Sequence, residues 1–139
     1  MSNDKIRAFI AIELSDEAKQ EIERVIEELK KANVLIRWAK SKTVHLTLKF
    51  LGSVEEEKLA SISETLKKIT KERTPFEINM DGIGAFPEWS RPKVLWVGLS
   101  GDDSEVRSMA DEIGSAMAGL GFEKENKEFR PHLTLGRVK

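Results

Sequence analysis

The tetrapeptide His-Leu-Thr-Leu occurs twice in this chain, at His45–Leu48 and at His132–Leu135, and the two copies contain both of its histidines. Successive side chains of a β-strand point to opposite faces, so the leucines of each copy share one face and the histidine and threonine share the other. Each copy therefore predicts a short strand that buries two leucines and presents an imidazole beside a hydroxyl. If the two strands lie side by side, both imidazoles and both hydroxyls converge on one cleft.

Two imidazoles in one cleft are suited to moving protons at neutral pH. An unperturbed imidazole titrates at about pH 6.5, so one ring can accept a proton while the other donates one. Around a phosphorus atom, His45 and His132 would act as general base and general acid in an in-line displacement. Thr47 and Thr134 would bind the non-bridging oxygens, and no metal ion is needed. A lone His-x-Thr pair on an exposed strand usually has no such role, and the repetition is what favours function here.

The composition limits the kind of protein further. The chain has 139 residues, with 23 Lys plus Arg and 24 Asp plus Glu, so we expect one domain that holds any RNA or nucleotide at a local site rather than along a basic surface. It has no cysteine, which excludes disulfides and thiolate sites. No apolar run approaches the length of a membrane span and the first residues do not resemble a signal peptide, so we expect a cytoplasmic protein without a membrane partner.

The offset between the two tetrapeptides extends to their surroundings. Shifting by 87 residues aligns the apolar runs Phe9–Ile12 and Trp96–Leu99, which indicates an internal duplication with pseudo-repeats at about 6–86 and 93–139. Lys139 then corresponds to Gly52, so the second repeat lacks a counterpart of residues 53–86, and we expect a chain that is short at its C-terminus.

Hydrophobic periodicity and turn residues predict the elements between these points. Ser15 is a predicted helix N-cap, Asn33 and Gly121 are predicted helix stops, and Ser53 with Glu56 reads as a capping box. The predicted strands are 6–13, 34–38, 43–51, 76–80 with a looser continuation to 86, 93–99, 122–128 and 131–138; the predicted helices are 15–32, one that starts at Ser53 and includes Ile69, and one between Gly101 and Gly121.

Several stretches together resemble one family. RAFIAIEL, HLTLKFLG, GIGAFP, RPKVLWVGL and FRPHLTLGRV are similar to the 2H phosphoesterases, specifically the LigT-like RNA 2′,3′-cyclic phosphodiesterases, also called 2′-5′ RNA ligases. The resemblance implies an α+β fold, a bilobal internal duplication of two antiparallel sheets with helices on the outside and the active-site groove between the lobes. We expect residues 1–139 to form a single domain of this kind.

The same resemblance implies an activity. It is the hydrolysis of RNA 2′,3′-cyclic phosphate ends to a 2′-phosphate, without metal or other cofactor, with RNA ends or nucleotides as partners and no obligate protein partner. His45 and His132 would be the acid/base pair, and Thr47 and Thr134 would bind phosphate oxygens. The family's usual assignment makes the first histidine the acid on the leaving O3′ and the second the base on water. Three alternatives stay open: 2′-5′ ligation as the main role, a non-catalytic module that binds nucleotides or RNA ends, and an inactive fragment.

Four further residues are candidates for substrate binding. Arg130 and Arg137 flank the second motif and can pair with phosphate, although strand parity directs Arg137 to the other face unless Gly136 bends the strand. Lys49 shares the parity of His45 and can add positive potential. Phe50 has core parity, yet the resemblance implies that an aromatic residue here can stack on a base. Trp89, in a loop bounded by prolines, is a second candidate for stacking.

Overall fold

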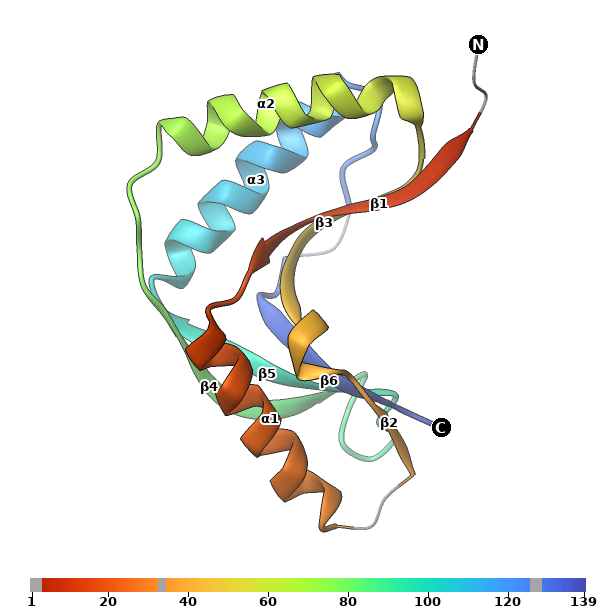
Figure 1. The fold of residues 1–139 in the computed structure, drawn as a ribbon, viewed down its shortest axis with the longest axis vertical. Coiled ribbons are helices and arrows are strands. Elements are labelled where there is room, and N and C mark those ends of the chain that lie inside the picture. The colour runs from red at the N-terminus through yellow and green to blue at the C-terminus, as the bar shows by residue number, and fades with distance from the viewer. Residues whose placement is uncertain (1–3, 33–34, 126–128) are drawn as a thin grey trace. The chain divides into compact units, whose positions relative to one another are not determined.

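The computed structural model describes residues 4–32, 35–125 and 129–139 (Figure 1). Within these residues the chain is α+β and both of its sheets are antiparallel, as predicted. In chain order its elements are β1 (Lys5–Glu13), α1 (Asp16–Lys30), β2 (Ile36–Trp38), the short 3₁₀ helix η1 (Ser41–Thr43), β3 (His45–Glu55), the 3₁₀ helix η2 (Glu56–Lys58), α2 (Leu59–Lys71), β4 (Ile78–Phe86), β5 (Val94–Gly101), α3 (Asp103–Gly119) and β6 (His132–Val138).

The chain divides into two compact units that interleave along the sequence. Unit 1 comprises Met1–Ala11, Thr47–Ile78 and Gly101–Pro131, and unit 2 comprises Ile12–Leu46, Asn79–Ser100 and His132–Lys139. Each unit therefore contains residues from both of the predicted pseudo-repeats. Two features agree with the 87-residue offset. Helix α1 begins at Asp16 and α3 begins 87 residues later, at Asp103. Strand β1 pairs with β3 in the first half, and their counterparts β5 and β6 pair in the second half.

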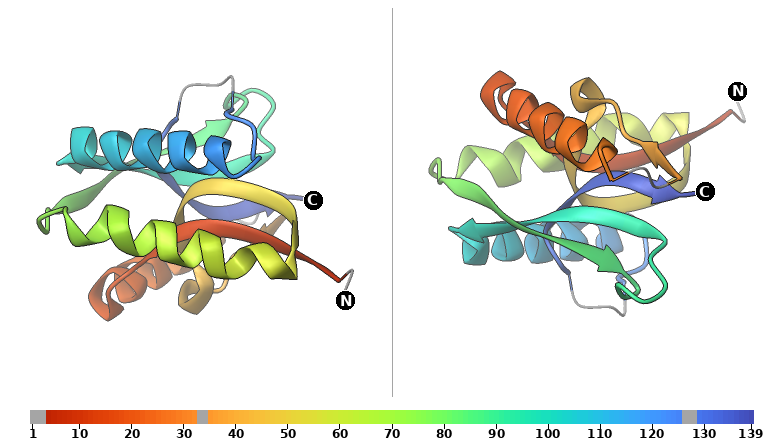
Figure 2. Two further views of the ribbon diagram at one scale, coloured as in Figure 1. Left: turned by 90° about the horizontal axis from the view of Figure 1, so that it is seen from above. Right: turned by 90° about the horizontal axis from the view of Figure 1, so that it is seen from below.

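Unit 1 consists of the β1–β3 pair and the helices α2 and α3, which lie side by side (Figure 1; Figure 2, left). Arg73, just after α2, ties the two helices together, because its guanidinium donates to Glu112 at 3.0 Å and to Ser108 at 3.2 Å. Apolar side chains one turn apart on each helix are buried, as the periodicity predicts. The buried apolar residues on the two helices are Ile62, Ile69, Val106, Met109, Ala110, Ile113 and Met117.

Unit 2 is built on a four-stranded sheet in the order β2-β6-β5-β4, with α1 over one of its faces (Figures 1 and 2). Ser15 caps α1 as predicted, since its hydroxyl accepts a hydrogen bond from the Ala18 N–H at 3.2 Å. Ile22 and Ile26 are the buried residues of α1. The buried apolar side chains of the strands are Leu46, Ala85, Leu95, Val97, Leu133 and Leu135.

The predicted stop of α3 at Gly121 is also confirmed. Gly121 has a φ of +100°, which an L-residue rarely adopts, and its N–H donates to the Ala118 carbonyl. The next N–H, that of Phe122, donates to Met117 at 2.9 Å. These two bonds are the Schellman arrangement that satisfies the last carbonyls of a helix.

The predicted capping box at Ser53 and Glu56 is wrong. β3 continues through Glu55 with Val54 fully buried, and the Glu56 N–H donates to the Asp4 carbonyl beside β1. The backbone donor that a capping box would use is thus bonded to the carbonyl of Asp4, the residue before β1. The helix begins later, at Leu59, without a side-chain cap.

The strand predicted at 122–128 does not form over residues 122–125. Within these residues the Glu123 carbonyl accepts a hydrogen bond from the Lys49 side chain at 2.6 Å. Further along the chain, the Phe129 carbonyl accepts one from Arg107 at 2.6 Å. The rest of that prediction, 126–128, and the predicted stop at Asn33 lie outside the described residues. In the part of the chain that the structure describes, no helix is long and apolar enough to cross a membrane.

Candidate active site

His45 is the first residue of β3, and one residue, Val44, separates it from η1. Its Nδ1 lies 2.8 Å from the carbonyl oxygen of Thr43. A carbonyl only accepts hydrogen bonds, so Nδ1 carries the proton that points to Thr43. Thr43 is held in turn within η1, where its hydroxyl donates to the Lys40 carbonyl at 2.9 Å. The 3₁₀ turn therefore selects the tautomer of His45.

His132 is the first residue of β6 and lies opposite Gly98 of β5, while Thr134 lies opposite Trp96. The neighbouring leucines, Leu133 and Leu135, are fully buried, and so is Leu46 beside His45. The predicted alternation of the two motifs is confirmed for these leucines. Both histidines belong to unit 2, and each stands at the start of a strand whose leucines fix its direction.

Aromatic rings surround the His132 imidazole. The ring of Phe86, at the end of β4, lies 5.0 Å from it in an edge-to-face arrangement, and the indole of Trp96 lies 6.3 Å away. Phe86 and Trp96 are themselves 5.1 Å apart. The three rings thus form a mutually contacting cluster that restricts the rotation of the imidazole.

Two glycines make room for this cluster. A Cβ at Gly84 would lie 2.7 Å from Cε2 of Trp96 and nearer still to Cζ2 and Cη2. A Cβ at Gly98 would lie 2.8 Å from the Asp81 carbonyl oxygen and 3.4 Å from Cζ3 of the same indole. The indole therefore lies flat over bare backbone at both strands. The sequence analysis did not identify Trp96 as a support for His132. The GIGAF stretch, which precedes the strand that contains Trp96, was the available signal.

A register shift in β6 decides where Arg137 points. Thr134 pairs with Trp96 but Gly136 pairs with Leu95, so Leu135 is an extra residue in β6. Such a bulge reverses the alternation that follows it. Gly136 then shares the buried face of Leu95, and Arg137 returns to the face of Thr134 and His132. We predicted that Arg137 would share the face of His132 only if the strand bends at Gly136. The strand has such an irregularity at Leu135, one residue before Gly136.

Four predicted residues belong to unit 1: Thr47, Lys49, Phe50 and Arg130. Thr47 is half-buried on β3, two residues from His45 on the same strand. Arg130 is exposed and lies two residues before the start of β6. The carbonyl next to it, that of Phe129, is held by Arg107.

The parity prediction for Phe50 as a core residue is wrong. Leu48 and Lys49 are both buried, so the alternation of β3 breaks there, and Phe50 is 65% exposed. Its ring lies 6.3 Å from that of Phe9 on β1, which is 48% exposed. Phe50 and Phe9 thus form an exposed aromatic pair.

Lys49 is only 6% exposed, and its ammonium donates to the Glu123 carbonyl. We expect Lys49→Met to lower the free energy of unfolding by about 1 kcal/mol, because the carbonyl loses a charged donor while the apolar stem is replaced. Chemical denaturation measures this. Lys42→Met, at an exposed lysine of η1, is the control. A large rise in KM with unchanged stability would instead give Lys49 a direct role on the substrate.

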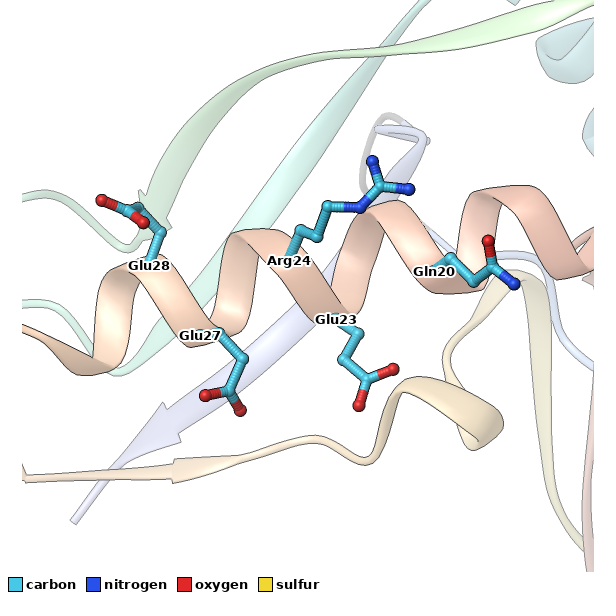
Figure 3. Close-up of a pocket in the computed structure, with 5 residues that line it drawn as sticks. All are labelled: Gln20, Glu23, Arg24, Glu27 and Glu28. Carbon is cyan, nitrogen blue, oxygen red and sulfur yellow. The ribbon is translucent and has the colours of Figure 1, made fainter.

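A separate hollow lies along α1, lined by Gln20, Glu23, Arg24, Glu27 and Glu28 (Figure 3). It contains none of the predicted site residues. Its lining has three carboxylates and one guanidinium, and this negative charge would repel a phosphate. The side chains in Figure 3 point outward from the helix. Among residues 4–32, 35–125 and 129–139, no group of three or more His, Asp or Glu side chains is placed to hold a metal ion.

Comparison with known proteins adds three findings. Residues 12–96 match the family model described as LigT like Phosphoesterase. Two relatives, each named RNA 2′,3′-cyclic phosphodiesterase, come from Archaeoglobus fulgidus (36% identical over 96% of this chain and 73% of the relative) and Aquifex aeolicus (33%, over 96% and 71%).

The solved structure of Escherichia coli LigT complexed with 3′-AMP superposes with a TM-score of 0.77 at 30% identity, covering 96% of this chain and 74% of that one. A structure from Thermus thermophilus, 24% identical, reaches a TM-score of 0.86 over 96% of this chain and 75% of that one, and it shows the likeness of fold alone.

Proposed function

Because the chain belongs to the LigT-like phosphoesterase family, we propose that it hydrolyses RNA 2′,3′-cyclic phosphate ends to 2′-phosphates with two histidines and no metal ion. The relatives' name gives the reaction class. One observation supports the mechanism most strongly. Both histidines are the first residues of strands in the same compact unit, and each imidazole is oriented by a neighbour: His45 by the Thr43 carbonyl and His132 by the Phe86 ring.

The proposed reaction is a single in-line displacement. One imidazole takes a proton from water as the water oxygen bonds to phosphorus, and the P–O3′ bond breaks as the other imidazole protonates O3′. Following the assignment that the family resemblance implies, His45 is the acid and His132 the base. Nε2 of His45 suits the first role, since Nδ1 is occupied by the Thr43 carbonyl. Solvent then restores both protonation states.

Thr47 and Thr134 donate their hydroxyl protons to the non-bridging oxygens, where negative charge grows in the transition state. Arg130 and Arg137 supply positive charge to phosphate, and Phe50 offers its exposed ring to the base. Lys49 acts through the segment whose carbonyl it holds, and contributes positive potential.

The test is turnover of a short RNA with a 2′,3′-cyclic phosphate end in the presence of EDTA. We expect the rate with EDTA to equal the rate without it, because proton transfer and hydroxyl donors complete the chemistry. Adding Mg²⁺, Mn²⁺ or Zn²⁺ after dialysis is the matched control. A rate abolished by EDTA and restored by one of these ions contradicts the mechanism. RNA binding without turnover supports a non-catalytic module, and joining to an added 5′-hydroxyl RNA supports the ligase.

A further inference from the structure

Strand β1 has a neighbouring strand on one edge only. It pairs with β3, and in the described part of the chain no other strand joins that sheet (Figure 1). The counterpart of β1 under the 87-residue offset is β5, which has β6 on one edge and β4 on the other. The edge of β1 that faces away from β3 therefore lacks the strand that covers the same edge of β5. Such an edge is a template for pairing with another strand.

The backbone groups of alternate β1 residues point to this edge. The N–H of Glu56, directly after β3, donates to the carbonyl of Asp4, so the backbone of Asp4 points toward β3. The N–H and C=O groups of successive residues in a strand point to opposite edges. The odd-numbered residues of β1, from Lys5 to Glu13, therefore direct these groups to the edge that lacks a strand.

The charges of β1 are complementary to those of a second copy of the same strand. In an antiparallel pair centred on Phe9, Lys5 of one copy lies opposite Glu13 of the other, and symmetry repeats the contact. Both residues are exposed, and Glu13 stays 88% exposed beside Lys19 at 3.9 Å. Opposite charges at facing positions stabilise a strand pair. A parallel pair in register would bring like charges together at both ends, so the charges favour the antiparallel arrangement.

The same register covers exposed apolar side chains. Ile6 is 41% exposed and would lie opposite the half-buried Ile12 of the other copy. Phe9 is 48% exposed and would lie beside its own copy at the twofold axis. Removing this apolar surface from water stabilises the pair. A single strand pair is small for a protein interface, so we expect a weak dimer with a dissociation constant in the micromolar range.

We propose that two copies of this chain associate through antiparallel pairing of their β1 strands. The pairing joins two β1–β3 sheets into one continuous sheet in the order β3-β1-β1-β3. Because the twofold contact uses the same edge of both copies, it is closed, and assembly stops at the dimer. The proposal does not depend on the catalytic activity.

The test is sedimentation velocity over a series of protein concentrations, in which we expect a monomer–dimer equilibrium for the wild-type protein. Lys5→Glu and Glu13→Lys each place like charges opposite each other, twice per dimer, and should raise the dissociation constant roughly tenfold. The double variant exchanges the two charges and should restore the wild-type value. Lys42→Glu is the matched control, because it makes the same change of net charge at an exposed lysine outside β1.

A second variant tests the backbone contact. Ala11→Pro removes an N–H that points to the edge without a strand, while the bonds between β1 and β3 stay in place. We expect a monomer with an unchanged circular dichroism spectrum. Amide hydrogen exchange gives an independent readout, since the amides of Arg7 and Ala11 in the wild-type protein should exchange more slowly as the protein concentration rises.

A wild-type protein that stays monomeric at a concentration of several hundred micromolar overturns the proposal. A dimer that Lys5→Glu does not weaken also overturns it, because the contact then lies elsewhere. If the double variant does not restore the dimer, the antiparallel register centred on Phe9 is wrong. Protection of the two amides that does not depend on protein concentration would show that this edge is covered within one chain, and it would overturn the proposal as well.

Discussion

His45→Ala and His132→Ala are each expected to lower kcat on a cyclic phosphate RNA end by roughly 10²- to 10⁴-fold, with KM within a few-fold of the wild-type value. Each variant removes one of two proton transfers in the same displacement. The double variant should be little worse than either single one, because residues that act as a unit do not contribute additively. Steady-state kinetics measures all three, and Lys42→Ala on the exposed side of η1 is a control for local disruption.

A substrate with a better leaving group separates the two roles. An activated aryl phosphodiester needs no protonation of its leaving oxygen, so the variant that lacks the acid should recover most of its activity on it. We expect this recovery for His45→Ala and not for His132→Ala. Recovery of the other variant reverses the assignment, and full activity of either variant on the RNA end contradicts a mechanism with two histidines.

Gly84→Ala is expected to lower the free energy of unfolding by about 3 kcal/mol and to reduce kcat roughly tenfold. The added Cβ occupies the volume of the Trp96 indole, as the 2.7 Å separation from Cε2 shows. The indole N–H is buried without an acceptor in the described residues, so packing holds the ring and no hydrogen bond can restore its position. A displaced Trp96 removes support from both Phe86 and the His132 imidazole.

Gly114→Ala, within α3, is the matched control, since a Cβ there has no atom within 4 Å. It should be neutral or stabilising by about 0.5–1 kcal/mol, because alanine favours a helix more than glycine does. Thermal unfolding and kcat are measured for both variants. A Gly84→Ala protein with wild-type stability and rate would show that the sheet accommodates the methyl group, and the support of His132 by Trp96 would be wrong.

The parts of this molecule that could be predicted from sequence depend on strong local patterns. The leucines at 46, 133 and 135 are buried because alternation along a strand is a local property. Ser15 begins α1 and Gly121 terminates α3, as predicted, because helix caps depend on a few adjacent residues.

The predictions that were wrong concern residues whose surroundings are determined by segments far away in the sequence. Ser53 failed as a cap because the backbone beside β1 takes the Glu56 N–H. Lys49 and Phe50 exchange their expected burial because a carbonyl 74 residues along the chain accepts from the lysine. No periodicity within β3 contains that information.

In the candidate site too, local sequence predicts some features and contacts between distant segments determine others. The two histidines were found by repetition, but their orientation depends on Thr43, Phe86 and Trp96, which come from a turn and two other strands. The direction of Arg137 depends on the bulge at Leu135, which the register of β6 against β5 shows. Strand register and bulges follow from pairing between segments, so single-sequence parity could not predict them.

The most direct test of the central proposal is the position of the phosphate in the product. A short RNA with a 2′,3′-cyclic phosphate end is incubated with the protein and EDTA, and the product is examined by ³¹P NMR. We expect a 2′-phosphate from the wild-type protein and unchanged cyclic phosphate with His45→Ala and with His132→Ala. A 3′-phosphate product, or a 2′-phosphate that still forms at the wild-type rate in either variant, would contradict it.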